Sequence, residues 1–174
     1  KEANAAYYNQ LLSRFNLPPL TEEELEFVHM HTVRQSVEYM LKRRGGEGAR
    51  LLSGVSESLA LLNYADFLGY MKIEPSLKEI LTYLRPRYRT AISTNRTTTM
   101  PMLLERFGLA SFFDLVVTAL DVIHPKPHPE SLWKILEAFK LKPHEAVYVG
   151  DSIVDQEAAK AANISLIAYS NSAL

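Results

Sequence analysis

The stretch AVYVGDSIVD at residues 146–155 decides the fold. It reads as a short buried strand, a Gly-Asp turn and the start of a helix. Asp151 and Asp155 are four residues apart, on one side of the first helical turn. Paired carboxylates at a strand end suit Mg²⁺, which proteins usually hold with one or two carboxylates and substrate phosphate oxygens. The same residues are an ordinary helix cap, so this stretch alone leaves both interpretations open.

From Glu74 onward the sequence alternates between strand and helix patterns. Strands alternating with helices predict an α/β fold with a parallel sheet and helices on its faces. Such sheets bind ligands beyond the carboxyl ends of their strands. We expect strands at 88–93, 114–118, 146–149 and 165–169, and helices at 76–84, from after the first strand to 107, at 129–139 (with Trp133 and Phe139 facing the core) and at 153–162.

Residues 1–73 have a helical pattern instead. An apolar stripe from Tyr7 to Phe15 predicts the first helix. Thr21 and Glu24 form a capping box, which opens a single helix predicted to run to the basic residues 42–44. More helix is expected to about Tyr70, with Leu52, Val55, Leu59, Leu62 and Phe67 as its apolar side. We therefore expect a helical domain at 1–73 and an α/β domain at 74–174 that is incomplete at both ends.

Composition excludes several classes of function. The 174 residues carry a net charge of −1, so no basic excess points to a nucleic-acid partner. No apolar run is long enough to span a bilayer, so no membrane partner is expected. The absence of cysteine excludes a disulfide framework and favours a reducing compartment. We expect a cytoplasmic protein that is a monomer or a homodimer.

Polar residues follow three of the predicted strands. Thr94, Asn95 and Arg96 offer a hydroxyl, an amide and a guanidinium that can bind phosphate oxygens, although such residues are also routine in turns. Lys126 lies between Pro125 and Pro127, which stiffen its loop. The third strand end is the acidic turn described above.

A hydroxyl, a lysine and an acidic pair in this order resemble the haloacid dehalogenase superfamily, and within it the phosphatases similar to phosphoglycolate phosphatase. Thr94 with Asn95 matches the second motif of that superfamily, Lys126 the third, and Asp151 with Asp155 the fourth. The resemblance implies a Rossmann-like parallel sheet with a small α-helical cap domain inserted near the N-terminus.

The first motif of the superfamily, Asp-x-Asp on the first strand, is absent from these residues. Residues 1–4 resemble those that directly follow it. The resemblance places that strand in the centre of the sheet, between the strands that end at Thr94 and Gly150. We expect the sequence to be a portion of a longer protein; a less favoured alternative is that another chain supplies the strand.

The function implied is Mg²⁺-dependent hydrolysis of a small phosphorylated metabolite through an aspartyl-phosphate. Thr94 and Lys126 would be catalytic, and both would bind phosphate together with Asn95 and Arg96. Asp151 and Asp155 would hold the metal. The alternatives are a phosphomutase or a phosphonate hydrolase on the same fold, and a catalytically inactive binding module. A response-regulator receiver is disfavoured, because its metal-binding acids precede its threonine.

Overall fold

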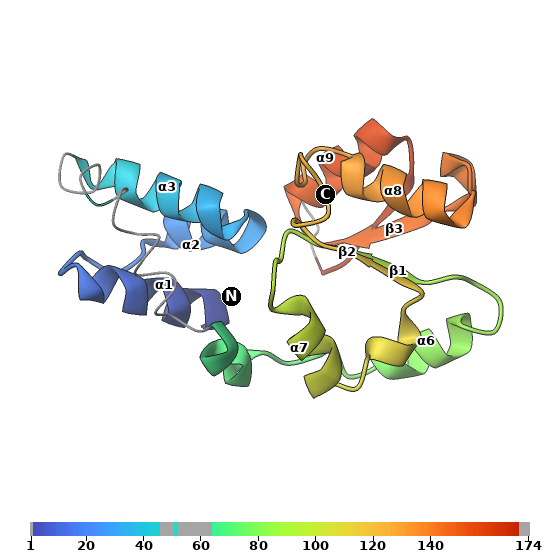
Figure 1. Ribbon diagram of the computed structural model, residues 1–174, viewed down its shortest axis with the longest axis horizontal. Helices are drawn as coiled ribbons and strands as arrows, with labels where there is room; N and C mark the ends of the chain where they lie inside the picture. Colours follow the sequence, from blue (N-terminus) through green and yellow to red (C-terminus); the bar gives the residue numbers. More distant parts are fainter. Residues whose placement is uncertain (1, 46–50, 52–63, 171–174) are drawn as a thin grey trace. The chain divides into compact units, whose positions relative to one another are not determined.

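The computed structural model of the protein describes residues 2–45, 51 and 64–170 (Figure 1). The chain divides into two compact units, Lys1–Ile73 and Glu74–Leu174. Each unit is described by itself. Within the described residues, no helix combines the length and the apolar character needed to cross a membrane.

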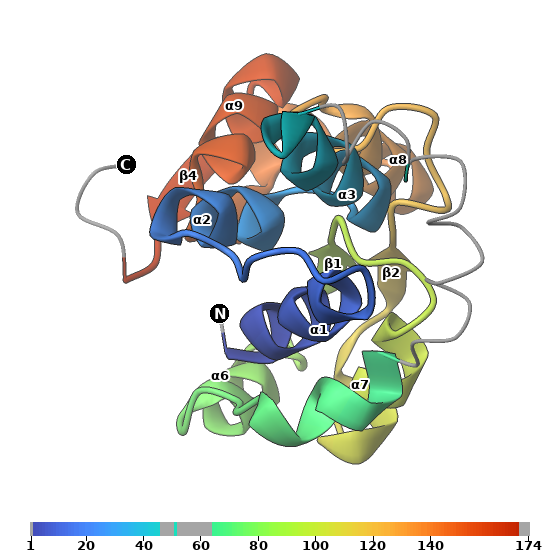
Figure 2. The ribbon, with the colours of Figure 1, turned by 90° about the vertical axis from the view of Figure 1, so that its left-hand side faces the viewer.

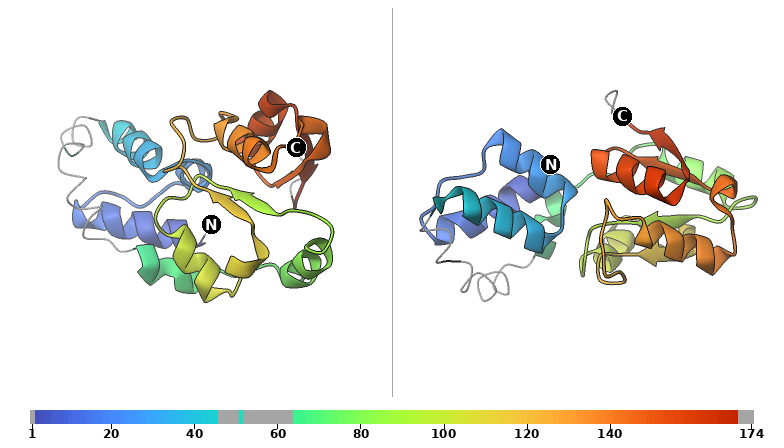
Figure 3. Two further views of the ribbon diagram at one scale, coloured as in Figure 1. Left: turned by 45° about the vertical axis from the view of Figure 1, so that its right-hand side comes forward. Right: turned by 90° about the horizontal axis from the view of Figure 1, so that it is seen from above.

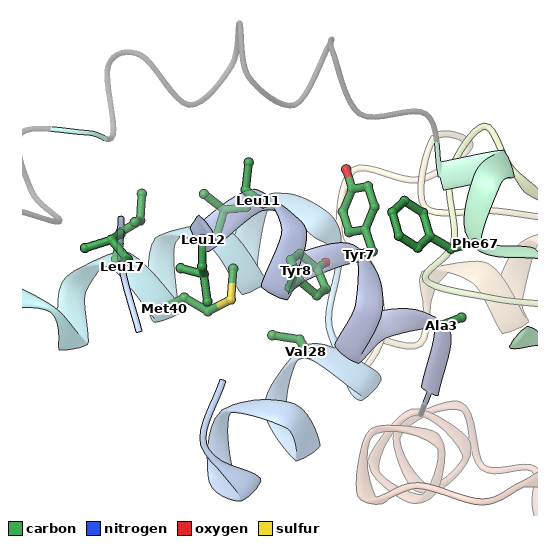
Figure 4. Close-up of a cluster of buried hydrophobic side chains, with 11 residues drawn as sticks. Ala3, Tyr7, Tyr8, Leu11, Leu12, Leu17, Val28, Met40 and Phe67 are labelled. Atoms are coloured by element: carbon green, nitrogen blue, oxygen red, sulfur yellow. The ribbon is translucent and has the colours of Figure 1, made fainter. Parts of the chain in front are cut away.

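The first unit is helical. It contains α1 (Glu2–Arg14), α2 (Glu22–Met30), α3 (Val33–Arg43) and the 3₁₀ helix η1 (Tyr64–Tyr70). Helix α1 packs on α2 and η1, and α2 packs on α3 (Figure 2). Their apolar faces form one cluster, in which the rings of Tyr7 and Phe67 meet edge to face at 5.5 Å (Figure 4). Burying this apolar surface stabilises the unit.

The single helix predicted after Thr21 is wrong, because the structure has two. Helix α2 ends at Met30, and Thr32 opens α3 with a second capping box. The Thr32 main-chain N–H donates to Oε1 of Gln35, and the Gln35 N–H donates to Oγ1 of Thr32. These bonds satisfy the main-chain groups of a new helix start. The predicted cap at Thr21 is confirmed.

Glu24, the other member of the first capping box, is buried. Its Oε2 accepts from the Thr21 N–H at 2.9 Å, and its Oε1 lies 2.6 Å from Nη1 of Arg44. Burial works to raise the pKa of Glu24, but the bond to Arg44, the Thr21 N–H and the charges of Arg44 and Arg43 hold that pKa below its usual value. A buried ion pair thus joins the start of α2 to the end of α3.

The second unit has four short parallel strands in two sheets. Strand β1 (Ala91–Ser93) pairs with β2 (Leu115–Val117), and β3 (Val147–Gly150) pairs with β4 (Ser165–Ala168). Within the described residues β1 and β3 are not paired with each other. This separation lies where the resemblance to the superfamily places its first strand. The predicted α/β class with parallel strands is confirmed.

Helices surround these strands. Helices α8 (Glu130–Phe139) and α9 (Ile153–Ala162) lie side by side on one face (Figures 1 and 3). Helices α6 (Leu77–Leu84) and α7 (Met100–Arg106) lie on the other side in Figure 1. Two 3₁₀ turns, η2 (Ala110–Phe112) and η3 (Pro143–Glu145), precede β2 and β3. The core beneath α8 and α9 is formed by Leu132, Leu136, Ala158, Ala159, Ala162 and Ile164.

Most predicted elements have the expected positions, with some differences. The strand predicted at 88–93 is limited to Ala91–Ser93. Trp133, predicted to face the core, is 48% exposed, and its ring packs edge-on against His128 in the preceding loop. Helix α7 is followed by Gly108 at a φ of +60°, which is the predicted helix stop. The predictions for residues 52–62 lie outside the described residues.

Candidate active site

The loops that follow β1, β2 and β3 meet around the side chain of Lys126. Its ammonium donates to the main-chain oxygen of Ser93 at 3.0 Å, to the hydroxyl of Tyr148 at 2.8 Å and to Oδ1 of Asp155 at 2.6 Å. Ser93 ends β1, and Tyr148 lies in β3, so Lys126 connects the two sheets. The lysine is buried, with 8% of its surface exposed.

The main chain of Lys126 is fixed by Asn95. The Asn95 side-chain amide donates to the Lys126 oxygen at 2.9 Å, and its Oδ1 accepts from the Lys126 N–H at 3.0 Å. This reciprocal pair joins the loop after β1 to the loop after β2. The structure thus shows Asn95 orienting Lys126, whereas phosphate binding by its amide stays a prediction.

Thr94 and Arg96 continue the turn after β1. The Thr94 N–H donates to the Val117 oxygen at 3.0 Å, which extends the pairing of β1 with β2. Oγ1 of Thr94 accepts from the Arg96 N–H at 3.1 Å, and the Arg96 oxygen accepts from the Ala119 N–H at 2.9 Å. The backbone of the turn is therefore held on both sides. Thr94 is the residue directly after Ser93, and the main-chain oxygen of Ser93 accepts a hydrogen bond from the Lys126 ammonium.

Asp155 accepts four hydrogen bonds in the first turn of α9. Oδ1 accepts from Lys126 and from the Tyr148 hydroxyl at 2.7 Å. Oδ2 accepts from the N–H of Ser152 at 3.2 Å and from its hydroxyl at 2.5 Å. A carboxylate offers about four lone-pair positions, so this set of donors uses its full accepting capacity. Asp155 therefore caps the helix and pairs with Lys126 at the same time.

Charge and burial act in opposite directions on Asp155. Burial works to raise the pKa of its carboxyl, but the Lys126 charge and the hydrogen bonds from Lys126, Ser152 and Tyr148 hold that pKa below its usual value. Burial, followed by the charge of Asp155, raises the pKa of the Tyr148 phenol. The phenol therefore stays protonated and can donate to Asp155.

Gly150 lets Asp155 come close to the end of β3. A Cβ atom at Gly150 would lie 2.5 Å from Cβ of Asp155 and 2.9 Å from its Cγ. Real Cβ atoms essentially never lie so close to another carbon, so a larger residue would displace the carboxylate. The glycine of the Gly-Asp turn is thus required by the approach of Asp155.

Asp151 differs from Asp155 in its surroundings. It directly follows β3 and is exposed, whereas Asp155 is 5% exposed. The charge of Asp151 is the smallest of the causes that raise the pKa of Tyr148. Among the described residues, no three His, Asp or Glu side chains gather as a metal site. An exposed carboxylate at a strand end still has the oxygen chemistry that Mg²⁺ prefers.

The sequence motifs missed Tyr148, Ser152 and the main-chain oxygen of Ser93. A signal for Tyr148 was present in the strand pattern. Side chains alternate along a strand, so Tyr148 shares a face with Gly150, while Val147 and Val149 point the other way and are 60% and 57% exposed. A polar ring on the core side of a short strand, two residues before the acidic turn, indicates a role at the site.

Fold and site together define an α/β protein whose polar residues gather at the carboxyl ends of parallel strands. Comparison with known proteins identifies the family: the chain belongs to the haloacid dehalogenase-like hydrolases, whose pattern matches residues 1–169. The superfamily resemblance seen in the sequence is confirmed, and so is the prediction of a hydrolase of this type.

Similar proteins include phosphatases. The chain is 30% identical over 169 residues to a phosphoglycolate phosphatase of Nitrosococcus oceani, covering 92% of this chain and 73% of that protein. It is 49% identical over 61 residues to the pyrophosphatase PpaX of Bacillus cereus, covering 35% of this chain and only 28% of that protein.

Among solved structures, a subfamily IA hydrolase of the same superfamily from Geobacter sulfurreducens matches with a TM-score of 0.81 and 33% identity, covering 99% of this chain and 83% of that one.

Proposed function

We propose that this chain belongs to a Mg²⁺-dependent phosphatase that hydrolyses a small phosphorylated metabolite. The observation that carries the proposal is the Lys126 ammonium, held at the carboxyl ends of β1 and β3 by Ser93, Tyr148 and Asp155. A fixed positive charge at this edge of the strands is suited to a phosphoryl group, because catalysis of phosphoryl transfer is mainly positioning and charge neutralisation.

The residues around Lys126 are assigned complementary roles. Thr94 donates a hydrogen bond to a phosphoryl oxygen, and Lys126 neutralises the phosphoryl charge. Asn95 holds Lys126 in place and can add a contact from its amide, and Arg96 contacts the rest of the substrate. The phosphoryl acceptor is the aspartate that the family carries in its Asp-x-Asp motif, which is absent from these 174 residues. The proposed reaction therefore requires a protein in which this motif accompanies these residues.

Asp151 is the proposed Mg²⁺ ligand. It is exposed at the end of β3, and it can provide one of the one or two carboxylates by which proteins usually bind this ion. Asp155 already accepts four hydrogen bonds from the protein, which favours a role in orienting Lys126 and the first turn of α9 over direct metal binding. When bound, Mg²⁺ would neutralise charge on the phosphoryl oxygens.

A phosphate-release assay on the full-length protein tests this proposal. We expect p-nitrophenyl phosphate to be hydrolysed with Mg²⁺ and not after its removal with EDTA. Restoration of activity by added Mg²⁺ is the matched control for the chelator. Absence of phosphate release from p-nitrophenyl phosphate and from phosphoglycolate, by folded full-length protein with Mg²⁺, would overturn the proposal in favour of a binding module.

Pyrophosphate hydrolysis is a second candidate. It is favoured by the 49% identity over 61 residues to a pyrophosphatase. Phosphoglycolate and pyrophosphate both present a phosphoryl group to Lys126, so the two candidate reactions differ in the leaving group. A comparison of kcat/KM for phosphoglycolate and pyrophosphate distinguishes them. A phosphomutase would instead interconvert sugar phosphate isomers without releasing phosphate, and a phosphonate hydrolase would release phosphate from a carbon–phosphorus bond.

The location and the assembly of the protein are part of the proposal. A cytoplasmic location is supported by the lack of cysteine, which fits a reducing compartment. We expect a monomer or a homodimer, and sedimentation of the full-length protein measures which. We also propose that the first unit, Lys1–Ile73, acts as the cap domain.

A further inference from the structure

Tyr148 contacts both charged groups of the candidate site. Its hydroxyl accepts from the Lys126 ammonium at 2.8 Å and donates to Oδ1 of Asp155 at 2.7 Å. The motif residues matched in the sequence do not include this tyrosine.

The hydrogen bonds of Lys126 show what the hydroxyl contributes. An ammonium has three N–H donors, and the three acceptors are the Ser93 oxygen, the Tyr148 hydroxyl and the Asp155 carboxylate. Of these acceptors only Asp155 is charged. Tyr148 therefore fixes the direction of the ammonium without cancelling any further charge, which a second carboxylate in its place would do.

The tyrosine ring is itself fixed. It packs against the apolar cluster beneath α8 and α9, which includes Leu136 and Ala159. An aromatic ring has only two side-chain torsions to order. The ring thus holds the hydroxyl between Lys126, which lies in a loop, and Asp155, which lies in a helix. These two residues are 29 positions apart in the sequence.

We propose that Tyr148 is a positioning residue that holds the Lys126 ammonium against Asp155 and so sets the direction in which the lysine presents its charge to a phosphoryl group. The contribution to turnover rests on the proposed phosphatase function, whereas the restraint on Lys126 does not. Without the hydroxyl, one N–H of the ammonium loses its acceptor and Asp155 loses a donor. The lysine side chain then turns toward solvent more often, because water can accept the hydrogen bond that the Tyr148 hydroxyl no longer accepts.

Chemical labelling of Lys126 tests the restraint without reference to activity. The full-length protein and its Tyr148→Phe variant are treated with sulfosuccinimidyl acetate, and acetylation of each lysine is followed by mass spectrometry. We expect Lys126 to react about tenfold to a hundredfold faster in Tyr148→Phe than in the wild type. This range corresponds to the loss of one hydrogen bond to a charged group. Exposed Lys160 is the internal reference, and its rate should not change.

The matched control is Tyr83→Phe. Tyr83 is 67% exposed on α6, and its hydroxyl accepts from Arg87. Its variant should leave the Lys126 rate unchanged. An equal Lys126 rate in the wild type and in Tyr148→Phe would overturn the proposal. A measurement on the wild type alone also tests the restraint on Lys126. Lys126 should be acetylated much more slowly than Lys134 on α8. Equal rates of these two lysines would overturn the proposed restraint even if Tyr148→Phe does not fold.

Kinetics separates positioning from simple support of the fold. With p-nitrophenyl phosphate, we expect Tyr148→Phe to lower kcat about tenfold or more while changing KM less, and Tyr83→Phe to change neither. An unchanged kcat in a variant with faster Lys126 labelling would overturn the catalytic part of the proposal. If the wild type itself is inactive, the proposed function fails, and the labelling result still supports or overturns the restraint.

Discussion

The ammonium of Lys126 lies 2.6 Å from Oδ1 of Asp155, and the two side chains are only 9% and 7% exposed. The pair joins the loop after β2 to the first turn of α9. Removing water from two charges is costly, and a buried pair offsets that cost only when further hydrogen bonds complete it. Here Ser93, Tyr148 and Ser152 provide those bonds. The pair is therefore sensitive to loss of either partner.

A double-mutant cycle on this pair should show strong coupling. We expect Lys126→Met and Asp155→Asn each to lower the free energy of unfolding by about 3–5 kcal/mol, because each disrupts a buried charge pair. The double variant should lose clearly less than the sum of the single losses. Urea unfolding measures all four proteins. The exposed pair Arg34–Glu38 is the control, and its own cycle should give a coupling below about 1 kcal/mol. If the losses of unfolding free energy in Lys126→Met and Asp155→Asn add up in the double variant, the two charges are not coupled, and this would contradict the prediction.

Gly150→Ala should disturb the site through contact with Asp155. The new Cβ would lie 2.5 Å from Cβ of Asp155, so the helix start must move. We expect a loss of stability of about 1–3 kcal/mol, typical of overpacking, together with a drop in phosphatase activity. Gly69→Ala is the matched control, because a Cβ there meets nothing within 4 Å. Thermal unfolding compares the two variants, and equal losses would show that the contact with Asp155 is relieved at little cost.

Asp151→Asn tests the metal ligand. We expect it to abolish Mg²⁺-dependent hydrolysis of p-nitrophenyl phosphate, because a neutral amide is a much poorer Mg²⁺ ligand than a carboxylate. Asp151 is exposed, so the melting temperature should change little. Glu157→Gln makes the same chemical change at an exposed position of α9 and should leave activity unaltered. Full activity of Asp151→Asn would argue against this aspartate as the metal ligand.

The pair of Glu24 and Arg44 in the first unit predicts a dependence of stability on pH. The pKa of Glu24 is lowered in the folded protein from a reference value of 4.5. Its contribution is therefore present above that unfolded value and is lost as the pH falls through the folded pKa. We expect Glu24→Gln, which keeps the capping box, to be less stable than the wild type by about 3–5 kcal/mol at pH 7, since it leaves Arg44 buried without its charge partner.

Thermal unfolding between pH 7 and about pH 3 measures this dependence, and the difference between the wild type and Glu24→Gln should shrink toward the acidic end. Glu38→Gln, in the exposed pair with Arg34, should show a small difference throughout this range. A constant difference between the wild type and Glu24→Gln would mean that the carboxylate charge of Glu24 does not stabilise the fold.

The local elements of this protein could largely be predicted from sequence, because they depend on neighbouring residues. The helix at 153–162 has its predicted bounds, and the cap at Thr21 and the stop at Gly108 are where the sequence places them. The break between α2 and α3 could also have been found, since Thr32 and Gln35 repeat the capping-box spacing. The apolar pattern continues across that break and conceals it.

The side-chain partners of the site could not be predicted in the same way. Sequence order predicts that Thr94, Lys126 and Asp151 follow strands of one parallel fold, and parallel strands place their carboxyl ends at one edge. It does not tell which atoms of Lys126 and Asp155 meet, because those atoms belong to segments brought together only by packing. The same holds for Asn95, whose amide contacts the main chain of Lys126.

The sequence by itself determined the class of fold, the family and the residues that follow the strand ends, because periodicity, caps and motif order can be read directly along the chain. Only the tertiary structure decided that Asp155 pairs with Lys126 and that the hydroxyl of Tyr148 contacts both. The physical reason is burial: a carboxylate and an ammonium removed from water must find partners, and the packed core determines which groups are within reach.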